Sequence, residues 1–318
     1  MDSFLYSLNA TVPVFAVMVT GYILKRIGWV NEGFVASADK FVFKVALPCM
    51  LFLDVWSTDI LHNFDAVYIG FCAGVTLVSI LVIWGLAKLL LKDRSEVGAF
   101  VQASYRSSAA ILGITFIQNI YGNSGMGPLM IIGAVPLYNI FAVTILAMES
   151  NASSVRAEKG RMKKTLVQIL TNPILVSILL GLVASLVSLK LPVMIEKSID
   201  SIGSLASPLA LIAIGAGFQG RKALAKGKAT LAAACIKLIA LAAIFLPLAV
   251  WMGFRDQKLL ALIIMLGSPT TPTAYIMAKN MQGDEVLSSS VIVVTTLFSS
   301  VTLTGWIFLM RSLGYLEG

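Results

Sequence analysis

Long apolar blocks, each about as long as a membrane-spanning helix, alternate with short polar connections along the whole chain. A helix rises 1.5 Å per residue, so about 20 mostly apolar residues cross the hydrocarbon core of a bilayer. Ten blocks reach that length, and we predict one transmembrane α-helix from each. The expected spans are 5–24, 37–57, 66–91, 97–120, 126–148, 166–188, 197–218, 229–254, 258–281 and 286–310. This pattern predicts an all-α membrane protein without a soluble domain.

Composition supports a lipid environment. Hydrophobic residues make up 58% of the chain and charged residues 13%, whereas a soluble domain carries about 25% charged residues. The net charge of +8 raises the question of nucleic acid, but the basic residues lie in short loops and form no reading surface. Nucleic acid is therefore not an expected partner. The three cysteines match no metal-site spacing, and we expect no cofactor.

Lysine and arginine residues are distributed unequally between the two sets of connections. With the N-terminus outside, the cytoplasmic connections hold 16 of them and the opposite connections five. This bias predicts that both termini are extracytoplasmic. The expected location is the cell membrane, the inner membrane of a bacterium.

Three short patterns recur about 160 residues apart. Thr11-Val12-Pro13 with Gly21 matches Thr171-Asn172-Pro173 with Gly181, residues 46–48 match 206–208, and 119–123 match 280–284. Five spans per copy make the second copy enter from the opposite side, as in secondary transporters with inverted repeats. We predict repeats at 1–150 and 166–318, joined by a basic cytoplasmic loop at 151–165. The alternative is that membrane helices reuse Pro and Gly by chance.

Span nine contains two prolines at mid-depth. Pro269 and Pro272 remove backbone donors and free the carbonyls of Met265 and Ser268. Thr271 before Pro272 has the chemistry of an N-cap and first helical residue. A half-helix that begins there would direct free N–H groups and a positive dipole end at an anion. A helix that is merely kinked is the alternative.

Span four has a corresponding polar centre without proline. Ser107 or Ser108 could cap a half-helix and Gly113 could permit a bend; here too a kinked helix is the alternative. Arg106 lies about ten residues into this span, where a central Arg costs at least ~2.5–3.5 kcal/mol. We interpret it as a carboxylate clamp or a cavity-lining charge. The other interpretation is a structural Arg, bonded to backbone carbonyls or extended to the interface.

Four polar or charged residues in other spans lead to weaker expectations. Asn139 in span five could bond the substrate or join helices, and joining helices is slightly favoured. Lys44 and Lys237 lie toward the cytoplasmic ends of their spans, so we expect both to extend to the interface. We expect Asp54 near the end of span two. Because no span has a clearly central carboxylate, a carboxylate proton relay is not predicted.

These stretches resemble the auxin efflux carrier family, which includes bacterial malate and malonate permeases and the plant auxin exporters. The residues that carry the resemblance are 105–113, 119–122, 206–211 and 268–278. The resemblance spans the whole chain and implies a scaffold helix set and a transport helix set, with spans four and nine crossing at the site. By position it implies that Ser107, Ser108, Pro269 and Thr270 border the substrate. Family members often carry Asn where Ser108 stands and Pro where Thr115 stands.

We therefore expect a secondary transporter that moves a small organic anion, a mono- or dicarboxylate, by alternating access. The expected substrate-binding residues are Arg106, Ser107, Ser108, Gly113, Asn139, Ser268, Pro269, Thr270, Thr271 and Pro272. The sequence leaves open which anion moves, in which direction, whether Na⁺ or H⁺ is coupled, and whether the carrier is a homodimer.

Three other classes compete with this interpretation. A sodium-coupled symporter of the bile-acid-carrier type would share the broken crossing helices, and a channel could use the same polar centre. An intramembrane enzyme would need a metal-binding His cluster, a buried Asp pair or a Ser–His pair, and the spans contain none. We therefore do not expect an enzyme.

Overall fold

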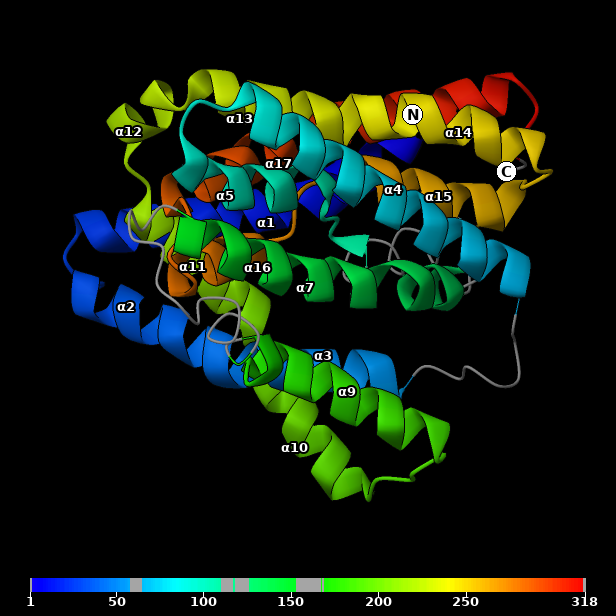
Figure 1. Ribbon diagram of the computed structural model, residues 1–318. Coiled ribbons are helices and arrows are strands. Elements are labelled where there is room, and N and C mark those ends of the chain that lie inside the picture. The colour runs from blue at the N-terminus through cyan, green and yellow to red at the C-terminus, as the bar shows by residue number, and fades with distance from the viewer. Residues whose placement is uncertain are drawn as a thin grey trace.

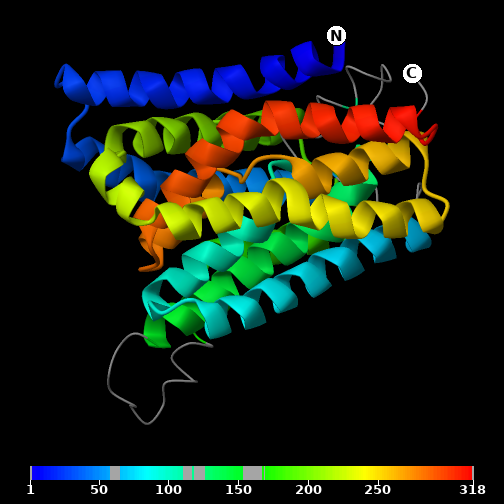
Figure 2. The same ribbon diagram turned by 90° about the horizontal axis from the view of Figure 1, so that it is seen from above.

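The computed structural model of the protein describes residues 2–57, 65–109, 117, 126–152, 167 and 169–316. Helices account for the regular structure of these residues, and no β-strand occurs among them. Most of the helices run side by side along one direction (Figures 1 and 2). The prediction of an all-α protein is confirmed for the part of the chain that is described.

The helices follow the predicted spans closely, and several spans are divided. In the first half they are α1 (Asp2–Arg26), α2 (Glu32–Phe41), the π-helical turn η1 (Val42–Ala46), α3 (Leu47–Trp56), α4 (Ala66–Leu90), α5 (Arg94–Tyr105) and α7 (Gly127–Ala152). In the second half they are α9 (Pro173–Leu186), α10 (Val193–Gly203), α11 (Ala206–Gly217), α12 (Gly220–Ala225), α13 (Gly227–Cys235), the π-helical turn η3 (Ile236–Ala240), α14 (Leu241–Trp251), α15 (Asp256–Gly267), α16 (Thr273–Asn280) and α17 (Glu285–Ser312).

Five of the described helical segments are long and apolar enough to cross a membrane. They are Ala66–Leu90, Gly127–Glu149, Val193–Gly217, Gly227–Trp251 and Glu285–Ser312, which correspond to predicted spans three, five, seven, eight and ten. Large apolar side chains are exposed on the outside of the bundle, among them Ile244, Val301 and Phe308, each more than 60% exposed. An outer surface of this kind is stable against lipid and not against water.

Polar residues in the connections start several helices by accepting a hydrogen bond from a free backbone N–H. Asn31 caps α2, Asp65 caps α4 and Asp284 caps α17. Asn172 caps α9, and Pro173 occupies its first turn. The matching Pro13 lies inside α1 instead. The same sequence pattern therefore begins a helix at Pro173 and lies within a continuous helix at Pro13.

The helices pack as two groups. The scaffold group comprises α1, α2, α3, α9, α10 and α11, in which α1 packs on α11 and α3 packs on both α9 and α10. The core group comprises α4, α5, α7 and α13 to α17. Figure 1 shows α2, α3, α9 and α10 together below α7, and Figure 2 shows α1 beside α17, where the two groups meet.

Glycines bring the scaffold helices into backbone contact at two matching places. A Cβ atom on Gly21 of α1 would overlap the carbonyl oxygen of Ile212 in α11. A Cβ atom on Gly181 of α9 would press on the carbonyl oxygen of Phe52 in α3. Gly21 and Gly181 are 160 residues apart, and so are Phe52 and Ile212. The two close contacts are therefore separated by the same interval as the recurring sequence patterns.

We predict that Gly215→Ala destabilises the protein, because a Cβ there would overlap the Met18 carbonyl oxygen and force α1 away from α11. Overpacking of this kind costs roughly 1–3 kcal/mol. Thermal unfolding of the detergent-solubilised protein, followed by size-exclusion chromatography, measures the loss. Gly74→Ala on α4, where nothing lies within 4 Å, should be neutral or stabilising. Equal melting temperatures for Gly215→Ala and the unsubstituted protein would contradict the close packing.

Candidate functional site

Span nine is interrupted at its centre, as its two prolines predict. Helix α15 ends at Gly267, α16 begins at Thr273, and the side chains of residues 268–272 between them are buried. The prediction that Thr271 caps the second half-helix is wrong. The capping position falls on Pro272 and has no side-chain cap, because the Thr271 hydroxyl bonds the Thr273 hydroxyl, 3.2 Å away, instead of a backbone N–H.

Span four is also interrupted. Helix α5 ends at Tyr105, and Arg106 adopts an extended backbone with φ −66° and ψ 136°. Arg106, Ser107 and Ser108 form the non-helical stretch, so the interpretation of span four as a merely kinked helix is not supported. Gly113, the predicted bend, lies outside the described residues.

The two interruptions are bonded directly to each other. The Ser108 N–H donates to the Pro269 carbonyl oxygen at 3.0 Å, and the Ser107 and Ser268 hydroxyls share a hydrogen bond. The Thr270 hydroxyl donates to the Ala103 carbonyl oxygen at 2.7 Å. The place where residues 106–108 meet residues 268–272 is called the crossing below. Backbone groups that lose their helical partners at each interruption bond groups of the other interruption there.

Arg106 is 4% exposed and lies at this crossing. One guanidinium nitrogen donates to Asn139 Oδ1 at 2.9 Å and to Thr273 Oγ1 at 2.8 Å. The other terminal nitrogen contacts Met277 Sδ at 2.7 Å, while Nε has no partner among the described residues. Neither backbone carbonyls nor carboxylates are among the described partners of Arg106. The buried position also excludes an Arg that extends to the membrane interface.

Asn139 joins helices, as its favoured interpretation predicts. Its Nδ2 donates to the Val135 carbonyl oxygen within α7, and its Oδ1 accepts from Arg106. The same side chain faces a small cavity, so the two interpretations of Asn139 do not exclude each other.

This cavity of about 40 Å³ lies between the crossing and α3. Five of the predicted site residues line it: Arg106, Ser107, Ser108, Asn139 and Thr271. Ser268, Pro269, Thr270 and Pro272 belong to the adjoining break and do not line it. A water molecule needs roughly 10–15 Å³ by this kind of measure, so the cavity has room for at most a few waters and is too small for a dicarboxylate.

Asp54 is a cavity residue that the sequence interpretation missed. It lies near the end of span two, as expected, because α3 ends at Trp56. It also lines the cavity with Met50 and Leu51, which precede it by four and three residues. Residues three and four apart share one helix face. The sequence spacing therefore indicates that Met50, Leu51 and Asp54 share one face of α3. It does not indicate that this face meets the crossing.

Charged residues connect the ends of α2 and α16. Lys279 Nζ lies 2.8 Å from Asp39 Oδ2 and donates to the Tyr275 hydroxyl at 2.9 Å. Asn280 Nδ2 donates to the Asp39 carbonyl oxygen at 3.3 Å. These bonds tie the scaffold group to the core group on the side where the basic connections lie.

A second cluster on that side lies within the core group. Lys226 Nζ is 2.6 Å from Glu96 Oε1 and 2.9 Å from Asp284 Oδ2. Burial lowers the pKa of Lys226, but the hydrogen bonds and charges of Glu96 and Asp284 outweigh burial and raise it above its ordinary value. The lysine is therefore firmly charged and holds the starts of α5 and α17 together.

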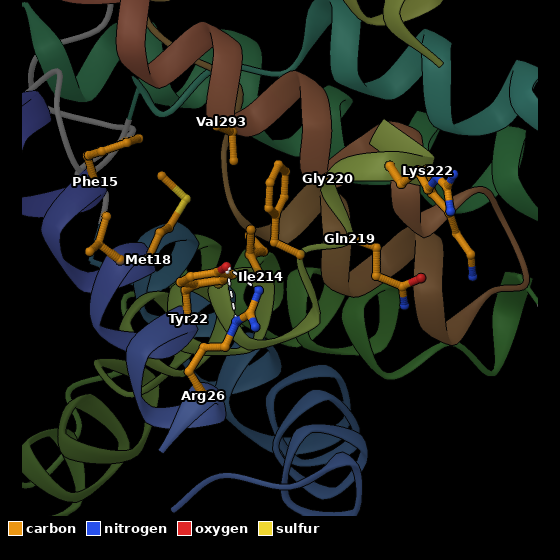
Figure 3. A pocket seen from close by; sticks show the side chains of 13 residues that line it. Phe15, Met18, Tyr22, Arg26, Ile214, Gln219, Gly220, Lys222 and Val293 are labelled. Carbon is orange, nitrogen blue, oxygen red and sulfur yellow. Dashed lines mark hydrogen bonds between the residues drawn. The ribbon is translucent and has the colours of Figure 1, made fainter. Parts of the chain in front are cut away.

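A larger crevice of about 750 Å³ lies between α1, α11 and α17 (Figure 3). Its lining is apolar near Phe15, Met18 and Val293, and Arg26 donates to the Tyr22 hydroxyl inside it. None of the predicted site residues lines this crevice. The crossing and the crevice are therefore separate features.

A sequence profile of the family described as "Membrane transport protein" matches residues 6–307. The chain belongs to this family, the auxin efflux carriers. The carrier is 26% identical to a protein named "Putative malonate transporter" from Rhizobium meliloti, with 94% of each chain covered. It is 23% identical to the uncharacterized transporter MJ1031 of Methanocaldococcus jannaschii over 95% of this chain and 99% of the relative.

A third relative covers less of the chain. The uncharacterized transporter YfdV of Escherichia coli K12 is 22% identical over 64% of this chain and 66% of its own length. The family and these relatives identify the protein as a membrane transporter and not an enzyme, as the sequence predicts.

We predict that Arg106→Met abolishes transport without lowering thermal stability. The change leaves Asn139 Oδ1 without its donor, which costs about 1–3 kcal/mol, but it also removes a buried charge whose desolvation costs several kcal/mol. Arg94→Met is the matched control, because Arg94 is exposed and bonds the Lys88 carbonyl oxygen. Melting temperature and transport rate are measured for both. A structural Arg106 would instead give a strongly destabilised variant.

Proposed function

We propose that the carrier is a secondary transporter for a small organic anion, a mono- or dicarboxylate, bound where the interrupted helices cross. The observation that carries the proposal is the buried Arg106 guanidinium, which faces a cavity and bonds no carboxylate in the described part of the protein. A charge in that position is costly. An anionic substrate would supply the missing partner.

The start of α16 favours an anion at the same place. Its first backbone N–H groups have no side-chain cap, and a helix N-terminus carries about half a positive charge. Thr271 and Thr273 beside this end line the cavity with Ser107 and Ser108. Hydroxyl groups and helix N-termini together are suited to bind carboxylate oxygens. We propose Arg106, Ser107, Ser108, Asn139 and Thr271 as direct contacts, with Ser268, Pro269, Thr270 and Pro272 holding the break open.

Because the cavity excludes a dicarboxylate, substrate must enter after the scaffold and core groups separate. The cavity wall is shared between them, with Met50, Leu51 and Asp54 from α3 and the remaining residues from the core. The Lys279–Asp39 pair closes the two groups at one end. An occluded arrangement of this kind supports alternating access, by rocking or by an elevator movement, and disfavours an open channel.

The ten-span inverted repeat is part of the same proposal. Ser107 meets Ser268, and Ser108 meets Pro269, each pair being 161 residues apart, close to the spacing of the sequence repeat. Positions that correspond under a two-fold axis meet each other only near that axis. With the matching contacts of Gly21 and Gly181, this supports repeats at 1–150 and 166–318 related by an axis through the crossing. A site on such an axis lies near the bilayer midplane.

The proposed setting is the cell membrane, with both termini outside and the basic connections in the cytoplasm. An inside-negative potential of 100 mV favours exit of each negative charge by about 2.3 kcal/mol. Export of the anion can therefore run without a coupling ion, whereas uptake needs one.

Proteoliposomes that contain the purified carrier should show saturable uptake and counterflow of at least one acid among malonate, malate and indole acetate. The Arg106→Met variant should show none, because the carboxylate loses the guanidinium group that faces the cavity. Radiolabelled acid in the vesicles is the measured quantity, with Arg94→Met as the control. Absence of movement for every acid tested, with folded protein in the vesicles, would contradict an organic anion substrate.

Asp54→Asn should lower the KM for the transported anion several-fold. The Asp54 carboxylate lines the same cavity, and removing a like charge from a poorly solvated site strengthens anion binding. Asp200→Asn on the exposed face of α10 is the control with the same charge change. Concentration-dependent initial rates give both KM values. A KM raised by Asp54→Asn alone would indicate that the carboxylate itself organises the site.

A further inference from the structure

The interruption of span nine leaves two adjacent carbonyl oxygens without helical donors. Pro269 has no N–H to offer the Met265 carbonyl oxygen. The Thr270 N–H, which would bond the Leu266 carbonyl oxygen in a continuous helix, donates to Thr295 Oγ1 at 3.1 Å instead. Both carbonyls lie at the C-terminal end of α15, where the helix dipole is negative. Together they form a buried site of negative potential that calls for a cation.

Lys237 supplies that cation from the neighbouring span. Its Nζ donates to the Leu266 carbonyl oxygen at 2.8 Å and to the Met265 carbonyl oxygen at 3.2 Å. The side chain is fully buried. The expectation that Lys237 extends to the membrane interface is therefore wrong, because the freed carbonyls of the break lie within its reach.

The local helix geometry places the lysine toward the break. Lys237 lies in the π-helical turn η3, and a π-turn inserts one extra residue that shifts the following side chains around the helix. Lys44 lies in the other π-helical turn, η1, but its side chain is exposed. The π-turn alone therefore does not bury a lysine.

In secondary transporters, unwound carbonyls and half-helix C-terminal ends coordinate the coupling Na⁺. Here an ammonium group already occupies such carbonyls. We propose that Lys237 is a tethered cation that fills a monovalent-cation site at the end of α15, so that the carrier works without Na⁺. This inference rests on the proposed function and specifies its coupling: the sodium-coupled alternative lacks an open site at these carbonyls.

The proposal is tested by emptying the site. Lys237→Ser removes the ammonium group, leaves space and adds one hydroxyl ligand, whereas Lys237→Arg keeps a cation. Melting temperature in detergent and anion uptake in proteoliposomes are measured in NaCl, KCl and choline chloride at equal ionic strength. Lys44→Ser is the matched control, with the same change in an exposed π-turn lysine.

For the unsubstituted carrier, for Lys237→Arg and for Lys44→Ser, we expect a melting temperature that does not depend on which of the three salts is present. Lys237→Ser should melt several degrees lower in choline chloride and regain stability in NaCl, where its transport should also be several-fold faster. Folding of Lys237→Ser only in the presence of Na⁺ would support the proposal equally. A higher melting temperature of the unsubstituted carrier in NaCl would overturn the proposal. A folded Lys237→Ser variant with the same melting temperature in all three salts would overturn it as well.

The two readouts separate this inference from the proposed function. The Na⁺-dependent shift in melting temperature needs no substrate, so it stands even if the carrier moves none of the acids tested. Conversely, Na⁺-driven uptake of an acid by the unsubstituted carrier would support the anion substrate and overturn the tethered cation.

Discussion

Backbone polar groups in the middle of a membrane protein find no water, so each needs a partner within the protein. The two interrupted helices meet this demand mainly through each other and through side chains from neighbouring spans. Ser108 N–H bonds the Pro269 carbonyl oxygen, and Thr270 bonds Ala103. Neither interruption would persist alone, because each exposes groups that the other satisfies. The polar centre of the carrier depends on this mutual arrangement.

The crossing has two cationic sides. Arg106 stands near the uncapped start of α16, where the dipole is positive, and its hydrogen-bond partners in the described part of the chain are neutral side chains. Lys237 stands at the end of α15, where the dipole is negative and two carbonyls accept from it. Lys237 donates to two backbone carbonyl oxygens, whereas Arg106 donates to neutral side chains. This difference supports the proposal that Lys237 stabilises the interruption of span nine and that Arg106 binds the substrate.

The close packing of the scaffold group and the small cavity at its border are related physically. Glycine contacts bring the backbones of α1 and α11, and those of α9 and α3, into direct contact. At the border with the core group, the Lys279–Asp39 ion pair joins the two groups, and a small cavity remains between them. A closely packed group beside a partly polar border supports the proposal that one group moves relative to the other.

The sequence by itself determined the class of protein, the five spans that match long apolar helices of the described chain and the interruption at Pro269 and Pro272. Apolar length and missing proline donors are local properties. It also identified Arg106, since a charge in an apolar block stands out without any structure. It did not determine the partners. Lys237 was expected at the interface, and the place of Asp54 on the cavity wall was not predicted, because the helix face that meets the crossing depends on how distant spans pack. The prediction that Thr271 caps α16 was wrong because the Thr271 hydroxyl bonds the Thr273 hydroxyl in the folded interruption. Tertiary structure therefore decided which groups the buried charges bond, because that depends on distances between segments far apart in the chain.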